Sequence, residues 1–333
     1  MFKDMLKEFL CTYGPTGRET CISNVIRAYV APNADEIYND TLGNLIAVKR
    51  GTSGKKVMIS AHMDQIGLIV TDIDENGFLR VSNVGGVNPI IAIAREVVFE
   101  NGTRGVTYFE TEKGGAADAT IQKLFIDIGA SSRDEAEKKV EIGDIAVYAA
   151  SFTELGRRIS CGALDDRLCC AIVAECFNTC VSEHDVYAVF TVQEEVGLRG
   201  AGVAAHSISP DFCVNLDVTL TGDTPKCSPM SVKCGKGPAI KVMDSSVIVP
   251  VGVRRFMERC AHESGIPVQN EVLRGGGTDT GAIIKTKGGI PAGCISIATR
   301  YIHTPVEMAD MDDVMNAVKL VNAMLAEKDI PTA

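Results

Sequence analysis

Polar side chains follow the ends of several buried strands that the sequence predicts. They are His62 and Asp64 after strand 57–61, Glu194 and Glu195 after strand 186–192, Asp217 after strand 212–216, and His303 after strand 291–297, while Asp165 and Asp166 open a helix. Open α/β sheets place their sites at such strand ends, so we expect these side chains to gather at one edge. Two histidines with at least three carboxylates suit Zn²⁺, Co²⁺ or Mn²⁺ in a site open to water. Divalent cations would also offset the repulsion between converging carboxylates.

Two of these pairs have a structural interpretation beside the chemical one. His62 and Asp64 are two residues apart, so in an extended segment both side chains leave on the same face. Asp64 could then orient a metal-bound imidazole, or His62 could be an ordinary hydrogen-bonded histidine. Asp165 and Asp166 could cap a helix, or one of them could bridge two cations with its two oxygens.

Glu194 and Glu195 follow an apolar strand, whose adjacent residues face opposite sides. One glutamate could therefore ligate a metal while the other faces a substrate cleft, and the alternative is that both are solvated surface residues. His303 lies in the segment Tyr-Ile-His-Thr-Pro, which is also typical of a hydrogen-bonded loop histidine.

Other catalytic motifs are poorly represented. The sequence contains no GxSxG, which argues against a serine nucleophile. The glycine-rich segment RGGGTDTG, residues 274–281, matches neither a P-loop nor GxGxxG, so we interpret it as a tight loop that lines a cleft.

The elements that must position these residues form an α/β pattern with an insertion. Short β-type runs between about residues 68 and 160 alternate with turn residues, and Asn76-Gly77 between two runs is typical of a hairpin. We expect a mixed-sheet α/β domain built from residues 1–67 and 161–333, with a small, mainly-β domain inserted at 68–160. Helices are predicted at 2–10, 166–180, 250–263 and 311–326, the last with Asp310 as its N-cap, and Thr16 with Glu19 could form a capping box for a further helix.

Composition excludes several classes of partner. The 333 residues carry a formal charge of −10, so a nucleic-acid partner is not expected. No apolar run is long enough to cross a membrane, and the first ten residues lack the apolar block of a signal peptide. The 12 cysteines lie in apolar segments without CxxC spacing, so we expect reduced, buried thiols in a cytoplasmic protein.

Seven ordered segments between residues 59 and 308 carry a family resemblance. They are ISAHMDQIG, GALDDRL, TVQEEVGLRGA, NLDVTLTGDTP, CGKGPAIKVMDSS, RGGGTDTGAI and ATRYIHTPVEM. The chain resembles the TET (tetrahedral) and glutamyl aminopeptidase family of cocatalytic metallopeptidases, some of whose members have been described as endoglucanases or deblocking aminopeptidases. The resemblance covers nearly the whole chain, including the insertion, which in that family is an assembly domain.

The resemblance implies a role for each site residue. It implies two divalent ions per subunit, Zn²⁺ or Co²⁺ with Mn²⁺ as an alternative, bridged by Asp165. One ion would also be held by His62 and Asp217, and the other by Glu195 and His303. Glu194 would be the general base and acid, Asp64 would steer His62, and the peptide between Asp165 and Asp166 would be strained or cis. Gln65 departs from the family pattern, in which an acidic residue often follows His-x-Asp.

The implied activity is removal of the N-terminal residue from short peptides with a free N-terminus. The implied assembly is a homo-oligomer in which dimers build a dodecamer. Alternatives are a carboxypeptidase, dipeptidase or amide deacylase with the same metal centre, a glycoside hydrolase that uses two carboxylates, and a metal-free binding or assembly module. The residue preference and the native metal stay open at this point.

Overall fold

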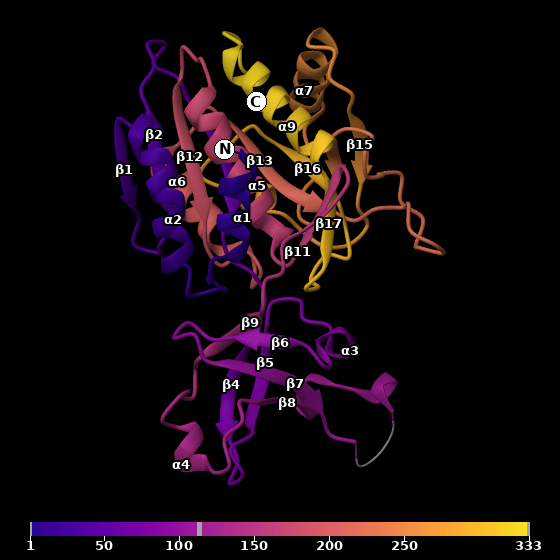
Figure 1. Ribbon diagram of the computed structural model, residues 1–333. Helices are drawn as coiled ribbons and strands as arrows, with labels where there is room; N and C mark the ends of the chain where they lie inside the picture. The colour runs from indigo at the N-terminus through magenta and orange to yellow at the C-terminus, as the bar shows by residue number, and fades with distance from the viewer. Residues whose placement is uncertain (1, 112–114, 332–333) are drawn as a thin grey trace.

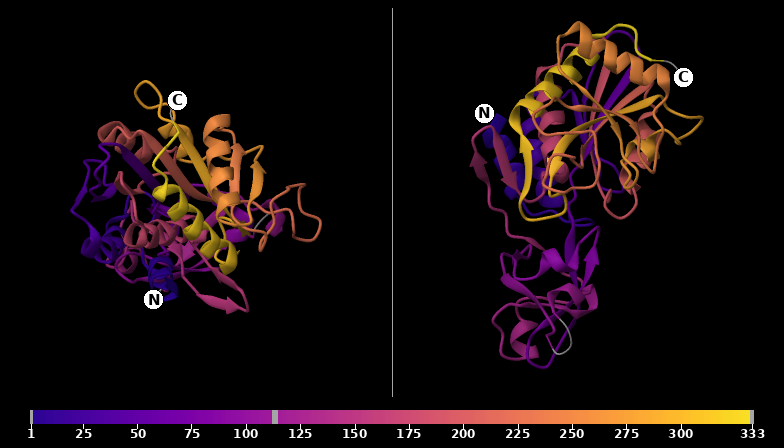
Figure 2. Two further views of the ribbon diagram at one scale, coloured as in Figure 1. Left: turned by 90° about the horizontal axis from the view of Figure 1, so that it is seen from above. Right: turned by 90° about the vertical axis from the view of Figure 1, so that its right-hand side faces the viewer.

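The protein has two parts, a large α/β domain and a smaller β-barrel that projects from it (Figures 1 and 2). This computed structural model describes residues 2–111 and 115–331. Both ends of the described chain lie in the large domain, so the barrel is an insertion, as the sequence predicts.

The large domain is built on a mixed, eleven-stranded sheet. Its main order is β1-β2-β12-β3-β13-β16-β17-β11-β10, with β14 paired to β15 and β16. The four central strands, β12, β3, β13 and β16, are parallel, so their carboxyl ends meet at one edge. The strands are β1 (Glu36–Asn39), β2 (Leu45–Lys49), β3 (Lys56–His62), β10 (Thr153–Leu155), β11 (Arg158–Cys161), β12 (Asp185–Thr191), β13 (Phe212–Thr219), β14 (Ala239–Met243), β15 (Gln269–Val272), β16 (Ala292–Arg300) and β17 (Glu307–Asp310).

Helices cover both faces of this sheet. One face packs against α1 (Phe2–Cys11), α2 (Thr20–Val30), α5 (Leu164–Thr179), α7 (Val251–Glu263) and α9 (Met311–Ala326), and the other against α6 (Arg199–Ile208) and α8 (Thr280–Ile283). A short 3₁₀ turn, η1 (Ala31–Asn33), follows α2. The central strands are buried along nearly their whole length because helices cover both faces of the sheet, and most of their residues are apolar.

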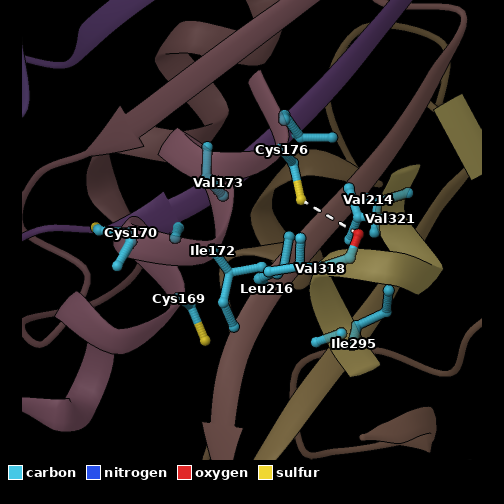
Figure 3. Packing of buried hydrophobic residues seen from close by; sticks show 14 of the residues in the cluster. Cys169, Cys170, Ile172, Val173, Cys176, Val214, Leu216, Ile295, Val318 and Val321 are labelled. Carbon is cyan, nitrogen blue, oxygen red and sulfur yellow. Dashed lines mark hydrogen bonds between the residues drawn. The ribbon is translucent and has the colours of Figure 1, made fainter. Parts of the chain in front are cut away.

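Helix α5 lies at the centre of the larger core. Ile172 and Val173 pack there with residues of β13, β16 and α9, and Cys176 donates a weak hydrogen bond from Sγ to the carbonyl oxygen of Val318 at 3.6 Å (Figure 3). Small thiols fit this crowded interior in place of larger apolar side chains. All 12 cysteines, each in the described part of the chain, are free thiols, and most are buried.

The inserted domain is a closed six-stranded barrel with the order β4-β5-β8-β7-β6-β9. Its elements are β4 (Gly67–Ile73), β5 (Leu79–Val84), α3 (Pro89–Ala92), β6 (Glu96–Val98), β7 (Arg104–Phe109), η2 (Ala116–Asp118), η3 (Ile121–Lys123), β8 (Leu124–Asp127), α4 (Arg133–Ala136) and β9 (Ile145–Tyr148). The Asn76-Gly77 hairpin joins β4 to β5, with Gly77 at φ +88°. Strands β10 and β11, which the sequence groups with the insertion, instead extend the large sheet through β17.

Local signals near the helix ends have mixed outcomes. Asp310 caps α9 as predicted, because its side chain accepts a hydrogen bond from the amide of Asp312. The predicted capping box of Thr16 and Glu19 is wrong, since neither side chain caps α2 and Thr16 Oγ1 instead donates to Asp64 at 2.7 Å. Across residues 2–111 and 115–331, no helix has the combination of length and apolar character that a membrane span requires.

Candidate metal centre and active site

His62 ends β3, and its imidazole is directed by the residue two positions later. The ring Nδ1 lies 3.1 Å from the backbone oxygen of Asp64 and 3.4 Å from its carboxylate, and both residues are buried. This arrangement turns Nε2 toward Asp165, whose Oδ1 is 3.0 Å away. An imidazole held at one nitrogen in this way presents the other in a fixed direction, as metal-binding histidines do.

Asp165 and Asp166 lie at the start of α5, where the backbone is not yet helical. The peptide bond between them is cis, in agreement with the expectation from the sequence. The amide of Asp165 donates to Glu307 Oε2 at 2.9 Å, and Asp166 Oδ2 accepts a 3.3 Å hydrogen bond from the amide of His62. Oδ1 of Asp166 is buried and has no hydrogen-bond partner among the described residues.

Glu194 and Glu195 lie in the loop after β12, not on the strand. Because β12 ends at Thr191, the expected alternation of their side chains does not apply. The backbone amides of Glu194 and Glu195 donate to the two carboxylate oxygens of Asp64, at 3.0 and 3.3 Å. Parallel pairing sets Thr191 opposite His62, which brings this loop beside the end of β3.

His303 completes the group from the loop between β16 and β17. Its Nε2 lies 3.3 Å from Asp165 Oδ2 and 3.1 Å from Glu195 Oε1. Its backbone amide donates to Glu307 Oε1 at 2.7 Å, and φ is +64°. Asp217 approaches from β13 and is buried, so all the residues singled out in the sequence meet at one edge of the sheet.

The side chains form two overlapping groups whose ligand atoms lie within 4.8 Å of one another. One consists of His62, Asp165 and Glu195, and the other of His62, Asp166 and Asp217. Imidazole nitrogens and carboxylate oxygens are the donors that Zn²⁺, Co²⁺ and Mn²⁺ share, so the donor set fits a divalent transition metal.

The electrostatics of the site favour added positive charge. Burial, followed by the nearby carboxylates, raises the pKa of Glu194 and of Asp217 well above their ordinary values. Burial also opposes protonation of His303, but Asp165 and Glu195 outweigh it and raise the pKa of His303 to about 11. The converging carboxylates thus favour the protonated, positively charged imidazoles. A divalent cation would supply positive charge to these carboxylates in the same way.

Three supporting residues were not assigned to the site from the sequence. Glu307 is buried and accepts from the amides of both Asp165 and His303, and burial raises its pKa to about 8. Thr16 donates to Asp64, and Glu19 accepts from the amide of Gln193 at 3.2 Å. The spacing of four residues between His303 and Glu307 is the one signal that could have revealed Glu307.

A cleft of about 1430 Å³ opens over this edge. Site residues such as His62 and Asp165 line it together with apolar residues such as Leu220, Met230 and Leu273. The Arg274–Gly277 part of the glycine-rich segment lines it, which confirms the predicted cleft loop.

Comparisons with known proteins agree with this architecture. The profile described as M42 glutamyl aminopeptidase matches residues 43–320. A protein of Acetivibrio thermocellus, whose description as an aminopeptidase is itself inferred, is 50% identical over 319 residues, which are 96% of each chain. The lysyl aminopeptidase of Pyrococcus furiosus is 38% identical over 97% of this chain and 96% of its own.

Solved structures give the same result. The aminopeptidase APDkam598 of the archaeon Desulfurococcus kamchatkensis has a TM-score of 0.94 at 36% identity, over 98% of this chain and 94% of that one. The TET1 peptidase of Pyrococcus horikoshii, which can assemble into a tetrahedron or a large octahedral shell, has a TM-score of 0.88 at 33% identity, over 98% and 100%.

Fold, site and relatives together define the class of this protein, which is a peptide hydrolase of the exopeptidase type. Within that class, the chain belongs to the M42 glutamyl aminopeptidase family, and it is an aminopeptidase with a candidate metal site of histidines and carboxylates.

Proposed function

We propose that this aminopeptidase uses two divalent metal ions to remove the N-terminal residue of short peptides. The observation that carries the proposal is the position of Asp165 between two imidazoles. Its Oδ1 lies 3.0 Å from Nε2 of His62, and its Oδ2 lies 3.3 Å from Nε2 of His303. A carboxylate that offers one oxygen to each side has the shape of a bridging ligand.

The remaining ligands divide between the two sides of Asp165. His62 and Asp217 would hold the first ion, and Glu195 and His303 the second. The close approach of Glu195 to His303 supports the second set, and the cluster of His62 with Asp217 supports the first. Asp166 belongs to that cluster too, so its unpaired Oδ1 makes it the competing candidate for the first site.

Bound divalent ions would supply Lewis acidity for the scissile carbonyl and lower the pKa of a water molecule. The protein's own contribution is Glu194, whose Oε2 lies 3.9 Å from Nε2 of His62 at the cleft wall. Its carboxylate takes a proton from the attacking water and passes it to the amine nitrogen that leaves as the C–N bond breaks. Burial favours the protonated form of Glu194, which suits a group that must hold this proton between the two steps.

Action at the N-terminus follows from the charge of the cleft. The cleft lining includes Asp165, Glu194, Glu195 and Asp217, which attract a free α-amino group, and apolar residues, which accept the first side chain. An N-acetylated peptide lacks the amine and should be a poor substrate. Short peptides are favoured over folded proteins because the chain end must reach the edge of the sheet.

Paired assays test this function against its rivals. We expect cleavage of aminoacyl-p-nitroanilides and free peptides, no cleavage of the same peptides after N-acetylation, and loss of activity in a chelator. A carboxypeptidase or deacylase would accept the blocked peptide, and a glycoside hydrolase would stay active in the chelator. Metal analysis by mass spectrometry identifies the ion as Zn²⁺, Co²⁺ or Mn²⁺ and counts the ions per subunit.

We also propose a homo-oligomeric assembly and a cytoplasmic location for this protein. The Pyrococcus horikoshii TET1 structures, one of them a dodecamer, support a homo-oligomer. We place the contact between paired subunits at the barrel, as the family resemblance implies. Light scattering tests this state, and a strict monomer would contradict it. The free thiols support a cytoplasmic location, because reduced cysteines are typical of that compartment.

A further inference from the structure

A loop of the inserted barrel, Gly85–Gly86 directly after β5, contacts His303 of the candidate metal centre. The backbone oxygen of Gly86 lies 3.1 Å from Nδ1 of His303 and accepts its hydrogen. The other ring nitrogen, Nε2, faces Asp165 and Glu195. One imidazole therefore joins the barrel to the site, with each nitrogen committed to a different domain.

The loop also has no room for a side chain at this point. A Cβ on Gly86 would lie 2.5 Å from Nδ1 and 2.7 Å from Cε1 of His303, and its third-nearest heavy atom also belongs to that ring. The ring would have to shift by about 1 Å to restore ordinary van der Waals contact. The nearest steric clash of a methyl group added at Gly86 is therefore with the ring of His303.

The neighbouring glycine makes a similar contact with another ligand candidate. Gly85 has φ +73°, and a Cβ there would lie 3.1 Å from both Cβ and Oε2 of Glu195 and 2.7 Å from Ile66 Cγ2. The loop thus packs against both residues that we assign to the second ion alone. At neither glycine do the three nearest heavy atoms belong to a residue that we assign to the first ion.

Backbone and side-chain hydrogen bonds also join the large domain to the barrel and to the segment that leads into it. Tyr13 donates from its hydroxyl to the carbonyl oxygen of Ile145 at 2.8 Å, and the amide of Thr16 donates to the carbonyl oxygen of Gln65 at 3.1 Å. Any shift of the barrel relative to the large domain therefore moves the Gly86 carbonyl relative to His303.

We propose that Gly86 is a positioning residue through which the inserted barrel sets the second metal site. Its carbonyl fixes the ring of His303 so that Nε2 faces Asp165 and Glu195, and its missing side chain leaves the space that the ring needs. The consequence for metal affinity rests on the dinuclear function proposed above, whereas the placement of the ring does not. Outer partners of metal-binding histidines typically contribute 10–100-fold in affinity.

Cobalt titration of the wild type, Gly86→Ala and Gly115→Ala tests the proposal. Gly115 lies in the same barrel, and no heavy atom of the described residues outside its chain neighbours lies within 4 Å of the place its added methyl group would take. This variant therefore controls for the methyl group itself. We expect Gly86→Ala to weaken one of the two Co²⁺ sites by 10–100-fold and to change its visible absorption, with the other site and the Gly115→Ala variant unchanged. Two unaltered cobalt sites in a folded Gly86→Ala protein would overturn the proposal.

Crystal structures provide a readout that needs neither metal nor activity. In metal-free Gly86→Ala the ring of His303 should move away from the new methyl group by about 1 Å and so change the position of Nε2 relative to Asp165, and a ring that keeps its wild-type position would refute the positioning role. The wild-type crystal structure decides the case even if the variant does not fold. There the Gly86 oxygen should accept from Nδ1, and a ring turned the other way would be incompatible with the proposal. A wild type that binds fewer than two ions would instead defeat the dinuclear function.

Discussion

A partly buried hydrogen bond of 3.0 Å joins the amide of Glu194 to the Oδ1 atom of Asp64. The same carboxylate lies beside Nδ1 of His62, so one side chain sets both the proposed base and a proposed metal ligand. Thr16 Oγ1 donates to its other oxygen and holds the carboxylate in place. Asp64 therefore positions the backbone of Glu194, and a substitution of the Glu194 side chain leaves this contact in place.

Glu194→Gln should keep both metal ions and lose at least about 100-fold in kcat, the usual scale for general acid–base catalysis. The amide has nearly the same shape but cannot take up the proton of the attacking water. Turnover of an aminoacyl-p-nitroanilide and metal content per subunit measure the two effects. Glu183→Gln, at a surface pair with Lys328, is the matched control and should leave kcat unchanged. A metal-loaded Glu194→Gln enzyme with near wild-type kcat would rule out the base.

Asp165→Ala should remove both ions, because the bridging carboxylate serves both sites. Glu195→Ala provides the comparison, since it should weaken the second ion and leave the first in place. Metal analysis after dialysis against a weak chelator distinguishes the two variants. Tight binding of two ions by Asp165→Ala would show that another carboxylate, Asp166 in the first instance, forms the bridge.

Stability of the metal-free protein should fall as pH rises from about 4 to 6, with a contribution from Asp279. This carboxylate is buried beside Thr191, and burial raises its pKa from 3.8 to about 6. The folded state then holds the proton more tightly than the unfolded state, so the stabilisation is present at low pH and is lost as pH rises through 6. The shift corresponds to about 3 kcal/mol.

Asp279→Asn should therefore flatten this part of the pH profile, measured by urea unfolding between pH 4.5 and 7. Asp329→Asn, at an exposed position, should leave the profile as it is in the wild type. An equal slope in wild type and Asp279→Asn would exclude Asp279 as a contributor.

Arg167→Met should lower the free energy of unfolding by at least about 3 kcal/mol. The buried guanidinium donates to the carbonyl oxygens of Phe9, Thr12, Gly14 and Met63, and so connects α5 to the end of α1. Methionine would leave these acceptors without a donor. Arg254→Met, which breaks the partly exposed pair with Glu258, should cost at most about 1 kcal/mol in the same urea titration. Similar costs for both variants would contradict the role of Arg167.

The sequence predicts most of the site because the relevant residues follow strands. His62, Glu194 and Asp217 come directly after or within apolar runs, and parallel strands bring such ends to one edge. Residues that act through distant partners carry no such signal. Thr16 and Glu19 match a capping box by spacing, but Thr16 donates to Asp64, which lies 48 positions away, and this tertiary contact overrides the local pattern.

Dependence on partners that are distant in the sequence also explains why Glu307, Gly86 and the place of β10 were not predicted. Glu307 accepts from two backbone amides, and Gly86 accepts from a ring 217 positions along the chain, so neither has a local motif. Strand β10 resembles the inserted β-rich segment in sequence, because only its pairing through β11 with β17 assigns it to the large sheet.

The pairing of the first and last barrel strands has a consequence for how the chain folds. Leu68 of β4 lies opposite Ala146 of β9, so the barrel begins and ends at neighbouring points. Once the barrel has folded by itself, a rigid unit instead of a long flexible loop connects His62 to Asp165, which are 103 positions apart in the sequence. The entropic cost of bringing these residues together is then that of the short joining segments, and the cost of closing a loop grows with its length. Early formation of the barrel would thus accelerate docking of α5 against β3.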